Sequence, residues 1–133
     1  MTIQESLVYN KELDNMEGFE DLGEYGRTNK IGNHVLVFLV RGLKENWKQP
    51  IGYFKSKGPM KADSMKPLLL DCIRHCSEAG LLIKSVTSDQ GTNNQRLYKI
   101  LGSTSEQPFF TLPGSTDKMF TFYDAPHLLK SKK

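Results

Sequence analysis

Two aspartates each follow an apolar segment typical of a β-strand, and their positions suggest chemistry. Asp89 closes the segment 81–88 (LLIKSVTS) and precedes a predicted helix, whereas Asp124 closes the segment 119–123 (MFTFY). In open α/β sheets, ligands collect at the carboxyl ends of strands, beside helix N-termini. A carboxylate there reaches a hard cation, while neighbouring N–H groups face an anion such as phosphate. If the two strands are neighbours, both carboxylates share one edge of the sheet.

Each aspartate also has a purely structural interpretation, and spacing alone does not separate the two. Asp89 would order a turn or assist the capping of the next helix, and Asp124 would end its strand in a turn fixed by Pro126. The segment 91–94 (GTNN) lacks the paired glycines and the lysine of a phosphate-binding loop. A nucleotide site around Asp89 and Thr92 is therefore the least favoured functional interpretation, and binding of labelled GTP would revive it.

A second cluster of residues suggests a zinc site. Cys72 and Cys76 lie four residues apart with His75 between them, and His34 or His127 would be further ligands. Both thiols fall on the apolar stripe of a predicted helix, where a free cysteine behaves as a small hydrophobic residue. No second pair has ligand spacing. The sequence therefore favours two buried thiols and a surface position for His75.

Charge is distributed unevenly along the 133 residues. Residues 1–26 carry seven acids and one lysine, a balance of −6, and the remainder carries seventeen bases and eight acids, a balance of +9. A basic surface is consistent with an anionic partner such as nucleic acid or with ordinary solvated lysines. Trp47, near Lys44, Lys48 and Lys55, is either a stacking platform for bases or an anchor under a turn, and the sequence favours the anchor.

Composition predicts one folded domain with a single core, because 38% of the residues are hydrophobic and 10% are aromatic. The chain has two cysteines, no apolar run of roughly 18 residues and no basic-then-apolar leader. We therefore expect a reducing, intracellular location without a membrane segment.

The sequence predicts β-strands in the N-terminal half. A hairpin is expected over about 5–20, and the continuous apolar run 34–41 (HVLVFLVR) predicts a strand buried on both faces inside a sheet. After a turn over 42–48, the segment 49–55 (QPIGYFK) predicts an antiparallel partner strand whose Pro50 lies at its start or at an edge.

The C-terminal half alternates helices and strands. Apolar residues at helical spacing predict a helix over 64–79, with Ser64 as N-cap, Pro67 in the first turn and Gly80 at the end. A buried strand over 81–88 and a second helix follow; Thr92 and Gln95 form its capping box, and its apolar side is made by Leu97, Ile100 and Leu101. That helix ends at Gly102, and 119–123 is the last strand. This order predicts an α/β domain with a mixed sheet and crossover helices.

Four segments of the sequence resemble a known protein family. They are GFEDLG (18–23), HVLVFLVRGLKENWKQPIGYF (34–54), AGLLIKSVTSDQGTNNQRLYKILG (79–102) and FTFYDAPHLLK (120–130). Together they resemble the ribonuclease-H-like catalytic domain of P-element-type transposases, which include THAP-containing transposases and their domesticated relatives. The combination of WKQP, SDxGxxN and DxPHLLK is specific, and the resemblance covers nearly all of residues 1–133.

The resemblance implies a cut-and-paste DNA transposase whose acids hold Mg²⁺ or Mn²⁺. Asp89 corresponds to the second of three catalytic acids, and Met1 resembles the methionine that follows the first. The first acid is thus expected immediately upstream and the third well downstream; Asp124 does not match the third. The implied partners are transposon ends, target DNA and further copies in a homo-oligomer. GTP would bind outside this chain, and the implied location is the nucleus.

The same resemblance implies a partial domain over 1–133, with its core over about 34–124 and without its central first strand. That strand would lie between 34–41 and 81–88, which must otherwise pair directly, be bridged by residues 2–9, or leave unsatisfied backbone groups. One carboxylate cannot hold two metal ions. The isolated chain is therefore expected to be inert and less stable than an intact domain.

The alternative function is a domesticated, non-catalytic module that keeps the fold to bind DNA or a protein partner. Basic residues such as Lys44, Lys48 and Arg96 would then give DNA binding that weakens as salt rises. An upstream aspartate on a strand together with a downstream glutamate would favour the enzyme, and loss of both would favour the binding module.

Overall fold

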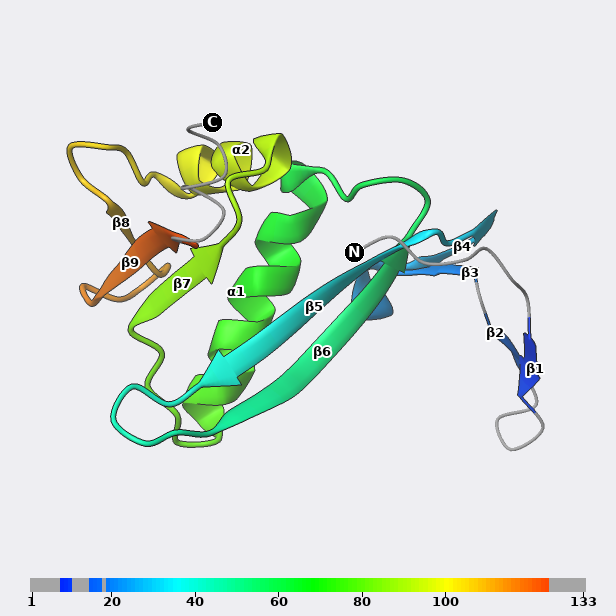
Figure 1. The fold of residues 1–133 in the computed structure, drawn as a ribbon, viewed down its shortest axis with the longest axis horizontal. Coiled ribbons are helices and arrows are strands. Elements are labelled where there is room, and N and C mark those ends of the chain that lie inside the picture. Colours follow the sequence, from blue (N-terminus) through cyan, green and yellow to red (C-terminus); the bar gives the residue numbers. More distant parts are fainter. Residues whose placement is uncertain (1–7, 11–14, 18, 125–133) are drawn as a thin grey trace. The chain divides into compact units, whose positions relative to one another are not determined.

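The computed structural model describes residues 8–10, 15–17 and 19–124, with side chains from residue 20 onward. The chain divides into two compact units, residues 1–60 and 61–133. The first unit contains strands and one short 3₁₀ helix, and the second contains both α-helices and a smaller sheet. Figure 1 shows the elements of each unit.

The described residues of the first unit form two antiparallel sheets. Its elements are β1 (Val8–Asn10), β2 (Asn15–Glu17), β3 (Phe19–Asp21), the 3₁₀ helix η1 (Gly23–Tyr25), β4 (Arg27–Ile31), β5 (His34–Arg41) and β6 (Lys48–Ser56). Strands β1 and β2 pair with each other, which confirms the hairpin expected over about 5–20. The other four strands form a sheet in the order β4-β3-β6-β5.

Strands β5 and β6 form the long antiparallel pair expected from the sequence. Their register runs from His34 opposite Ser56 to Arg41 opposite Lys48, with an irregularity after Phe38. Pro50 lies opposite Leu39. Strand β3 pairs with β6 only near its far end, at Lys55, so Pro50 has a strand on one side alone. The expectation that Pro50 sits near the start or at an edge is confirmed, because proline has no N–H for a second ladder.

The expectation that the apolar run 34–41 is buried on both faces inside a sheet is wrong. Strand β5 has the expected bounds but is the last strand of its sheet, and its burial alternates. Val37 and Leu39 are 43% and 51% exposed. A run of uniformly apolar residues carries no period of two, so the sequence does not reveal that only one face is covered.

Helix α1 (Ala62–Glu78) begins two residues before the expected start. Lys61 is its N-cap, and the carbonyl of Lys61 accepts bonds from the N–H groups of Ser64 and Met65. Ser64 therefore lies inside the helix and Pro67 in its second turn, so both N-terminal expectations are wrong. The expected end is confirmed: Gly80 has φ +89°, which glycine adopts without a Cβ penalty.

The predicted apolar stripe of α1 forms part of the core. Among the residues that the structure describes, the buried hydrophobic residues all lie in the second unit: Ala62, Met65, Leu68, Leu69, Ile73, Cys76, Leu97, Tyr98, Phe110 and Met119. Helix α2 (Thr92–Leu101) packs against α1. Leu97 and Tyr98 carry its buried side, whereas Ile100 and Leu101 are only half-buried.

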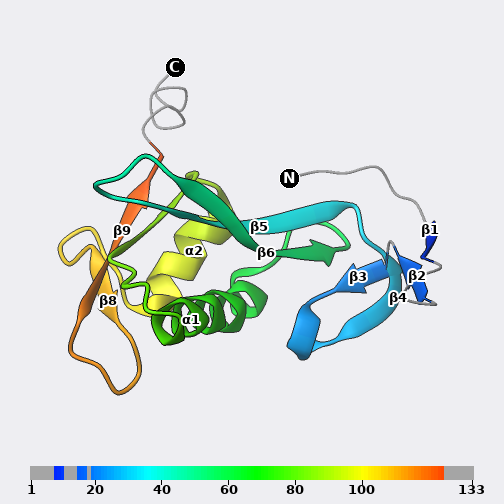
Figure 2. The same ribbon diagram turned by 90° about the horizontal axis from the view of Figure 1, so that it is seen from below.

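The second unit also contains a mixed three-stranded sheet, in the order β7 (Ser85–Ser88), β9 (Lys118–Tyr123) and β8 (Phe109–Thr111). Strands β7 and β9 are parallel, and β8 and β9 are antiparallel. Both views place α1 and α2 on the same side of this sheet (Figure 1, Figure 2). The expected α/β class, mixed pairing and crossover helix are confirmed, although the mixed pairing is confined to this smaller sheet.

Two details of this sheet differ from expectation. Strand β7 starts at Ser85 rather than at residue 81, and Leu82 before it is 75% exposed. The sequence did not predict β8, because three residues are too few to show a period.

Strands β5 and β7 belong to different sheets, and within the described residues each is the last strand of its sheet. Residues 8–10 of β1 pair with β2, so this part of residues 2–9 does not form the expected bridge. Residues 2–7 lie outside the described part.

Two leucines test this assignment of the core. Leu68→Ala removes a side chain that is 2% exposed, and we expect a loss of ~2–5 kcal/mol in the free energy of unfolding. Leu82→Ala removes a side chain that is 75% exposed and should cost under about 0.5 kcal/mol. Urea denaturation followed by circular dichroism measures both, and equal losses would contradict the assignment.

Candidate functional site

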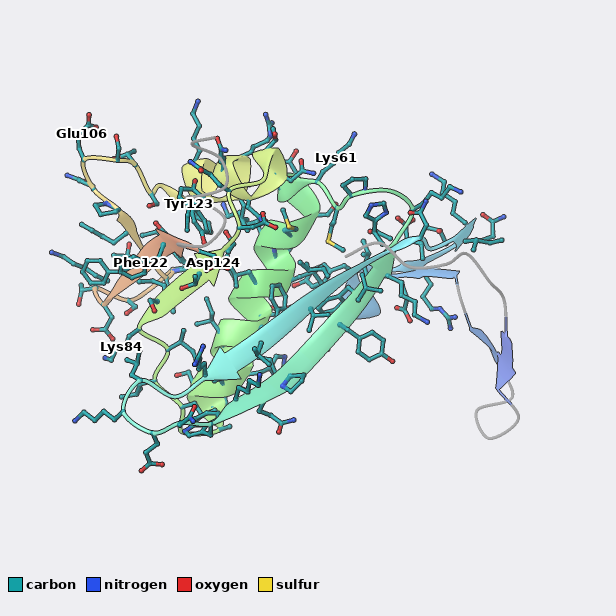
Figure 3. All side chains as sticks on the ribbon, viewed as in Figure 1. Lys61, Lys84, Glu106, Phe122, Tyr123 and Asp124 are labelled. Carbon is teal, nitrogen blue, oxygen red and sulfur yellow. The ribbon has the colours of Figure 1, made fainter. Side chains whose placement is uncertain are left out.

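The two aspartates singled out from the sequence lie at one edge of the mixed sheet. Parallel pairing sets Ser88 of β7 beside Tyr123 of β9, so Asp89 and Asp124 directly follow two paired residues. The N–H of Asp124 donates a 2.7 Å hydrogen bond to the carbonyl of Ser88. We call this place, with both aspartates, the β7–β9 edge; Figure 3 labels Tyr123 and Asp124 there. The expectation that neighbouring strands would bring both acids to one edge is confirmed.

The side chain of Asp89 is exposed and orders the turn into α2. Its Oδ1 accepts hydrogen bonds from the backbone N–H of Gly91, at 2.9 Å, and from Nδ2 of Asn94, at 2.8 Å. The structural role left open by the sequence is therefore present. A carboxylate has about four acceptor sites, so ordering a turn and holding a cation are compatible roles.

The predicted capping box of α2 is wrong. Gly91 is the N-cap, Thr92 is the first helical residue, and no side chain caps Gly91. Gln95 Nε2 instead donates to the carbonyl of Gln90 at 2.7 Å. The expected box would have made Thr92 the N-cap. Asp89 instead accepts a hydrogen bond from the N–H of Gly91, and the helix begins at Thr92, one residue earlier than the box required.

Gly91 allows the backbone to pass close to the carboxylate. A Cβ on Gly91 would lie 2.9 Å from Asp89 Oδ1, so a larger residue would displace that oxygen. The close approach of the carboxylate, rather than a positive φ, therefore explains why glycine occupies this position of SDxGxxN.

Tyr98 lies beneath the β7–β9 edge, and sequence reasoning missed it. The phenol is 4% exposed, and its hydroxyl lies 2.8 Å from Ser88 Oγ and 2.9 Å from the carbonyl of Phe122. Burial raises the pKa of Tyr98 above its usual value, and the hydrogen bond from Ser88 only partly opposes this. The hydroxyl therefore stays protonated at neutral pH. Its only signal in the sequence was an aromatic residue next to the predicted apolar position Leu97.

Within the described residues, no group of three or more His, Cys, Asp or Glu side chains is placed to hold a metal ion. The β7–β9 edge supplies two carboxylates, and oxygen ligands of this kind suit Mg²⁺ or Mn²⁺. The edge therefore fits part of a metal site.

The zinc alternative gains no support from the described residues. Cys76 is buried, but Cys72 is only half-buried, so the expectation of two buried thiols is confirmed for Cys76 alone. Partial burial, followed by the nearby Cys76 and Asp71, raises the pKa of Cys72 to about 11. His75 is exposed beside Glu78, and His34 Nδ1 contacts Asn33 Oδ1 at 2.7 Å. His127 lies outside the described residues.

Trp47 behaves as the anchor that the sequence favoured. Its carbonyl accepts a 3.0 Å bond from the N–H of Gly42, and a Cβ on Gly42 would lie 2.5 Å from the indole Nε1. The indole therefore packs directly on the glycine backbone, while 38% of the residue stays exposed. Lys44 and Lys48 beside it are exposed.

The raised pKa of Cys72 predicts slow alkylation. At about pH 7 iodoacetamide should modify this thiol more than a hundredfold more slowly than in the urea-unfolded chain, because a free thiol has a pKa of about 8.5. The rate should rise about tenfold per pH unit until about pH 11. Trypsin cleaves after Arg74, so mass spectrometry separates Cys72 from Cys76. Equal rates at neutral pH in the folded and unfolded chains would contradict the burial.

Comparisons with known proteins relate this chain to a transposase family. The family described as "TNP-like, RNase H N-terminal domain" matches residues 1–102, which include Asp89 but not Asp124. Transposable element P transposase of Drosophila melanogaster is 36% identical over 99 residues, which are 74% of this chain and 12% of that protein. Human DNA transposase THAP9 is 25% identical over 142 aligned positions, covering 98% of this chain and 15% of that protein.

A solved structure shows the same fold. The chain in the Drosophila P element transposase strand transfer complex matches with a TM-score of 0.77 and 28% identity, over 99% of this chain and 26% of that one. The present chain thus spans about an eighth of the length of the curated relatives. None of the helices in the described residues is long and apolar enough to cross a membrane. Sequence and structure together show that this chain belongs to the TNP-like RNase H N-terminal domain family and has the ribonuclease-H-like fold of P-element-type transposases.

Proposed function

We propose that this chain is part of the catalytic core of a cut-and-paste DNA transposase, in which Asp89 is a catalytic ligand for Mg²⁺ or Mn²⁺. The observation that carries the proposal is the exposed carboxylate of Asp89 at the carboxyl end of β7, directly before α2. This is where α/β sheets collect ligands. The residue also lies inside the segment that matches the family.

The reaction class sets what the rest of the site must supply. Two metal ions about 3.5–4 Å apart activate the attacking oxygen and stabilise the leaving oxygen of a phosphodiester. Several carboxylates are needed to hold them. The described residues offer Asp89 and its neighbour Asp124, and Asp124 does not match the third acid of the family. We therefore propose that the other two acids come from polypeptide outside residues 1–133, and that this chain alone is inert.

The geometry around Asp89 supports a ligand role through pre-organisation. The two donors to Oδ1, from Gly91 and Asn94, hold the carboxylate in one orientation. Both belong to the start of α2, so the carboxylate and the helix N-terminus form one local unit. A ligand that is already oriented loses little conformational entropy when it binds a cation.

DNA is the partner that this function requires, and the proposal includes transposon ends and target DNA. The Drosophila relative of known structure is a strand transfer complex. In the present chain, the exposed side chains of Lys44, Lys48 and Arg96 supply positive charge. The proposal also includes a nuclear location, a homo-oligomer and a GTP site outside this chain, because the resemblance to transposases implies them.

A second candidate is a non-catalytic module of the same fold that binds DNA or a protein. It is favoured by one observation: the bonds from Gly91 and Asn94 already give Asp89 a structural role. The two candidates differ in whether Asp89 also binds a cation.

Manganese binding separates them, and Asp89→Asn is the sharpest variant because its amide oxygen still accepts the two turn bonds. In a longer polypeptide that contains residues 1–133 and supplies the other two acids, we expect Mn²⁺ to broaden the backbone NMR signals of residues 88–91 selectively, and Asp89→Asn to weaken this binding at least about tenfold. Asp117→Asn, an exposed carboxylate in the loop before β9, is the matched control and should leave binding unchanged.

Equal Mn²⁺ affinity in the wild-type chain and in Asp89→Asn would remove Asp89 from the metal site. Absence of selective broadening in the wild-type chain would favour the non-catalytic module.

A further inference from the structure

We infer that Tyr98 is the positioning residue of the β7–β9 edge: its hydroxyl ties β7 to β9 directly beneath Asp89 and Asp124. The inference rests on the proposed metal role of Asp89 and adds the residue that sets where its carboxylate lies. Tyr98 itself is not expected to touch a metal ion or DNA, because it is 4% exposed.

One buried oxygen joins three elements. Tyr98 comes from α2, and its hydroxyl accepts a hydrogen bond from Ser88 Oγ of β7 at 2.8 Å. The same hydroxyl donates to the carbonyl of Phe122 on β9 at 2.9 Å. Ser88 immediately precedes Asp89, and Phe122 lies two residues before Asp124. The two bonds therefore act within two residues of both aspartates.

The surroundings keep this hydroxyl in place and protonated. The rings of Tyr98 and Tyr123 are 5.2 Å apart between centroids, so β9 also restrains the phenol through its ring. Burial raises the pKa of Tyr98, and the neutral hydroxyl is the form that donates to Phe122. A buried carbonyl that loses its donor costs free energy, which favours this one arrangement.

Both restraints on Asp89 then originate in α2. Tyr98 bonds to Ser88, the residue before Asp89. Gly91 and Asn94, which follow Asp89, donate hydrogen bonds to its carboxylate. A rigid helix thus fixes the carboxylate relative to β9. A fixed orientation matters for metal binding, because mutation of the residues that hydrogen-bond to metal ligands commonly changes metal affinity about 10- to 100-fold.

Tyr98→Phe tests the inference, because it keeps the buried ring and removes only the hydroxyl. We expect the Kd for Mn²⁺ in the same longer polypeptide, measured from the broadening of signals 88–91, to rise roughly tenfold. The measurement is made where the variant is at least about 95% folded, since a purely structural role would leave the affinity of folded molecules unchanged. Tyr53→Phe, which removes a hydroxyl from a residue of β6 that is 68% exposed, is the control and should bind as the wild-type chain does.

The outcomes are distinguishable from those of the proposed function. If the wild-type chain binds Mn²⁺ and folded Tyr98→Phe binds it equally well, the positioning role is wrong and the role of Asp89 stands. If the wild-type chain shows no selective broadening, both fall.

Should Tyr98→Phe not fold, Ser88→Ala replaces it. That variant removes the 2.8 Å bond to Tyr98 and the 3.0 Å bond from Ser88 Oγ to the Asp89 carbonyl, and it leaves the bonds from Tyr98 to the carbonyls of Phe122 and, at 3.4 Å, Val86. We expect weaker Mn²⁺ binding in Ser88→Ala as well. Unchanged binding in this variant would overturn the inference.

Discussion

The parallel pairing of β7 with β9 is the constraint on which the candidate site depends. It aligns Ser88 with Tyr123 and carries the bond from the Asp124 N–H to the Ser88 carbonyl. Two residues that are 35 positions apart in the sequence thereby reach the same edge of one sheet. A shift of the pairing by one residue would turn the side chains of one strand to the opposite face. The register, rather than either aspartate by itself, therefore brings two aspartates to one edge of the sheet, where the Asp89 carboxylate contacts the start of α2.

Helix α2 converts this register into a defined site. Its first turn holds the carboxylate of Asp89 through Gly91 and Asn94, and its buried Tyr98 holds the strands behind that carboxylate. The segment SDxGxxN is consequently explained residue by residue: the aspartate accepts, the glycine allows close approach, and the asparagine donates. Local turn chemistry and long-range strand pairing thus act on the same few atoms. A chain with only one of the two would place the carboxylate loosely.

The sequence predicted those parts of the fold in which one period dominates. The apolar stripe of α1 and the glycines that end both helices were correct, because helical spacing and positive φ leave clear patterns. The shared edge of Asp89 and Asp124 was predicted conditionally, from strand ends alone. The burial of β5, the start of β7 and the three-residue β8 were not predictable, because their neighbours in the sheet decide them. Tyr98 was missed for the same reason: its partners lie on two strands that are distant in sequence.

The central claim is that Asp89 holds a catalytic metal ion in a transposase. The most direct measurement is Mg²⁺-dependent cleavage of terminal-repeat DNA by a longer transposase polypeptide that contains residues 1–133, with Asp89→Ala and Asp117→Ala compared side by side. The account predicts that Asp89→Ala reduces cleavage to the level seen without metal ions, while Asp117→Ala cleaves normally and both variants still bind the DNA. Cleavage by Asp89→Ala at the wild-type rate would contradict the account.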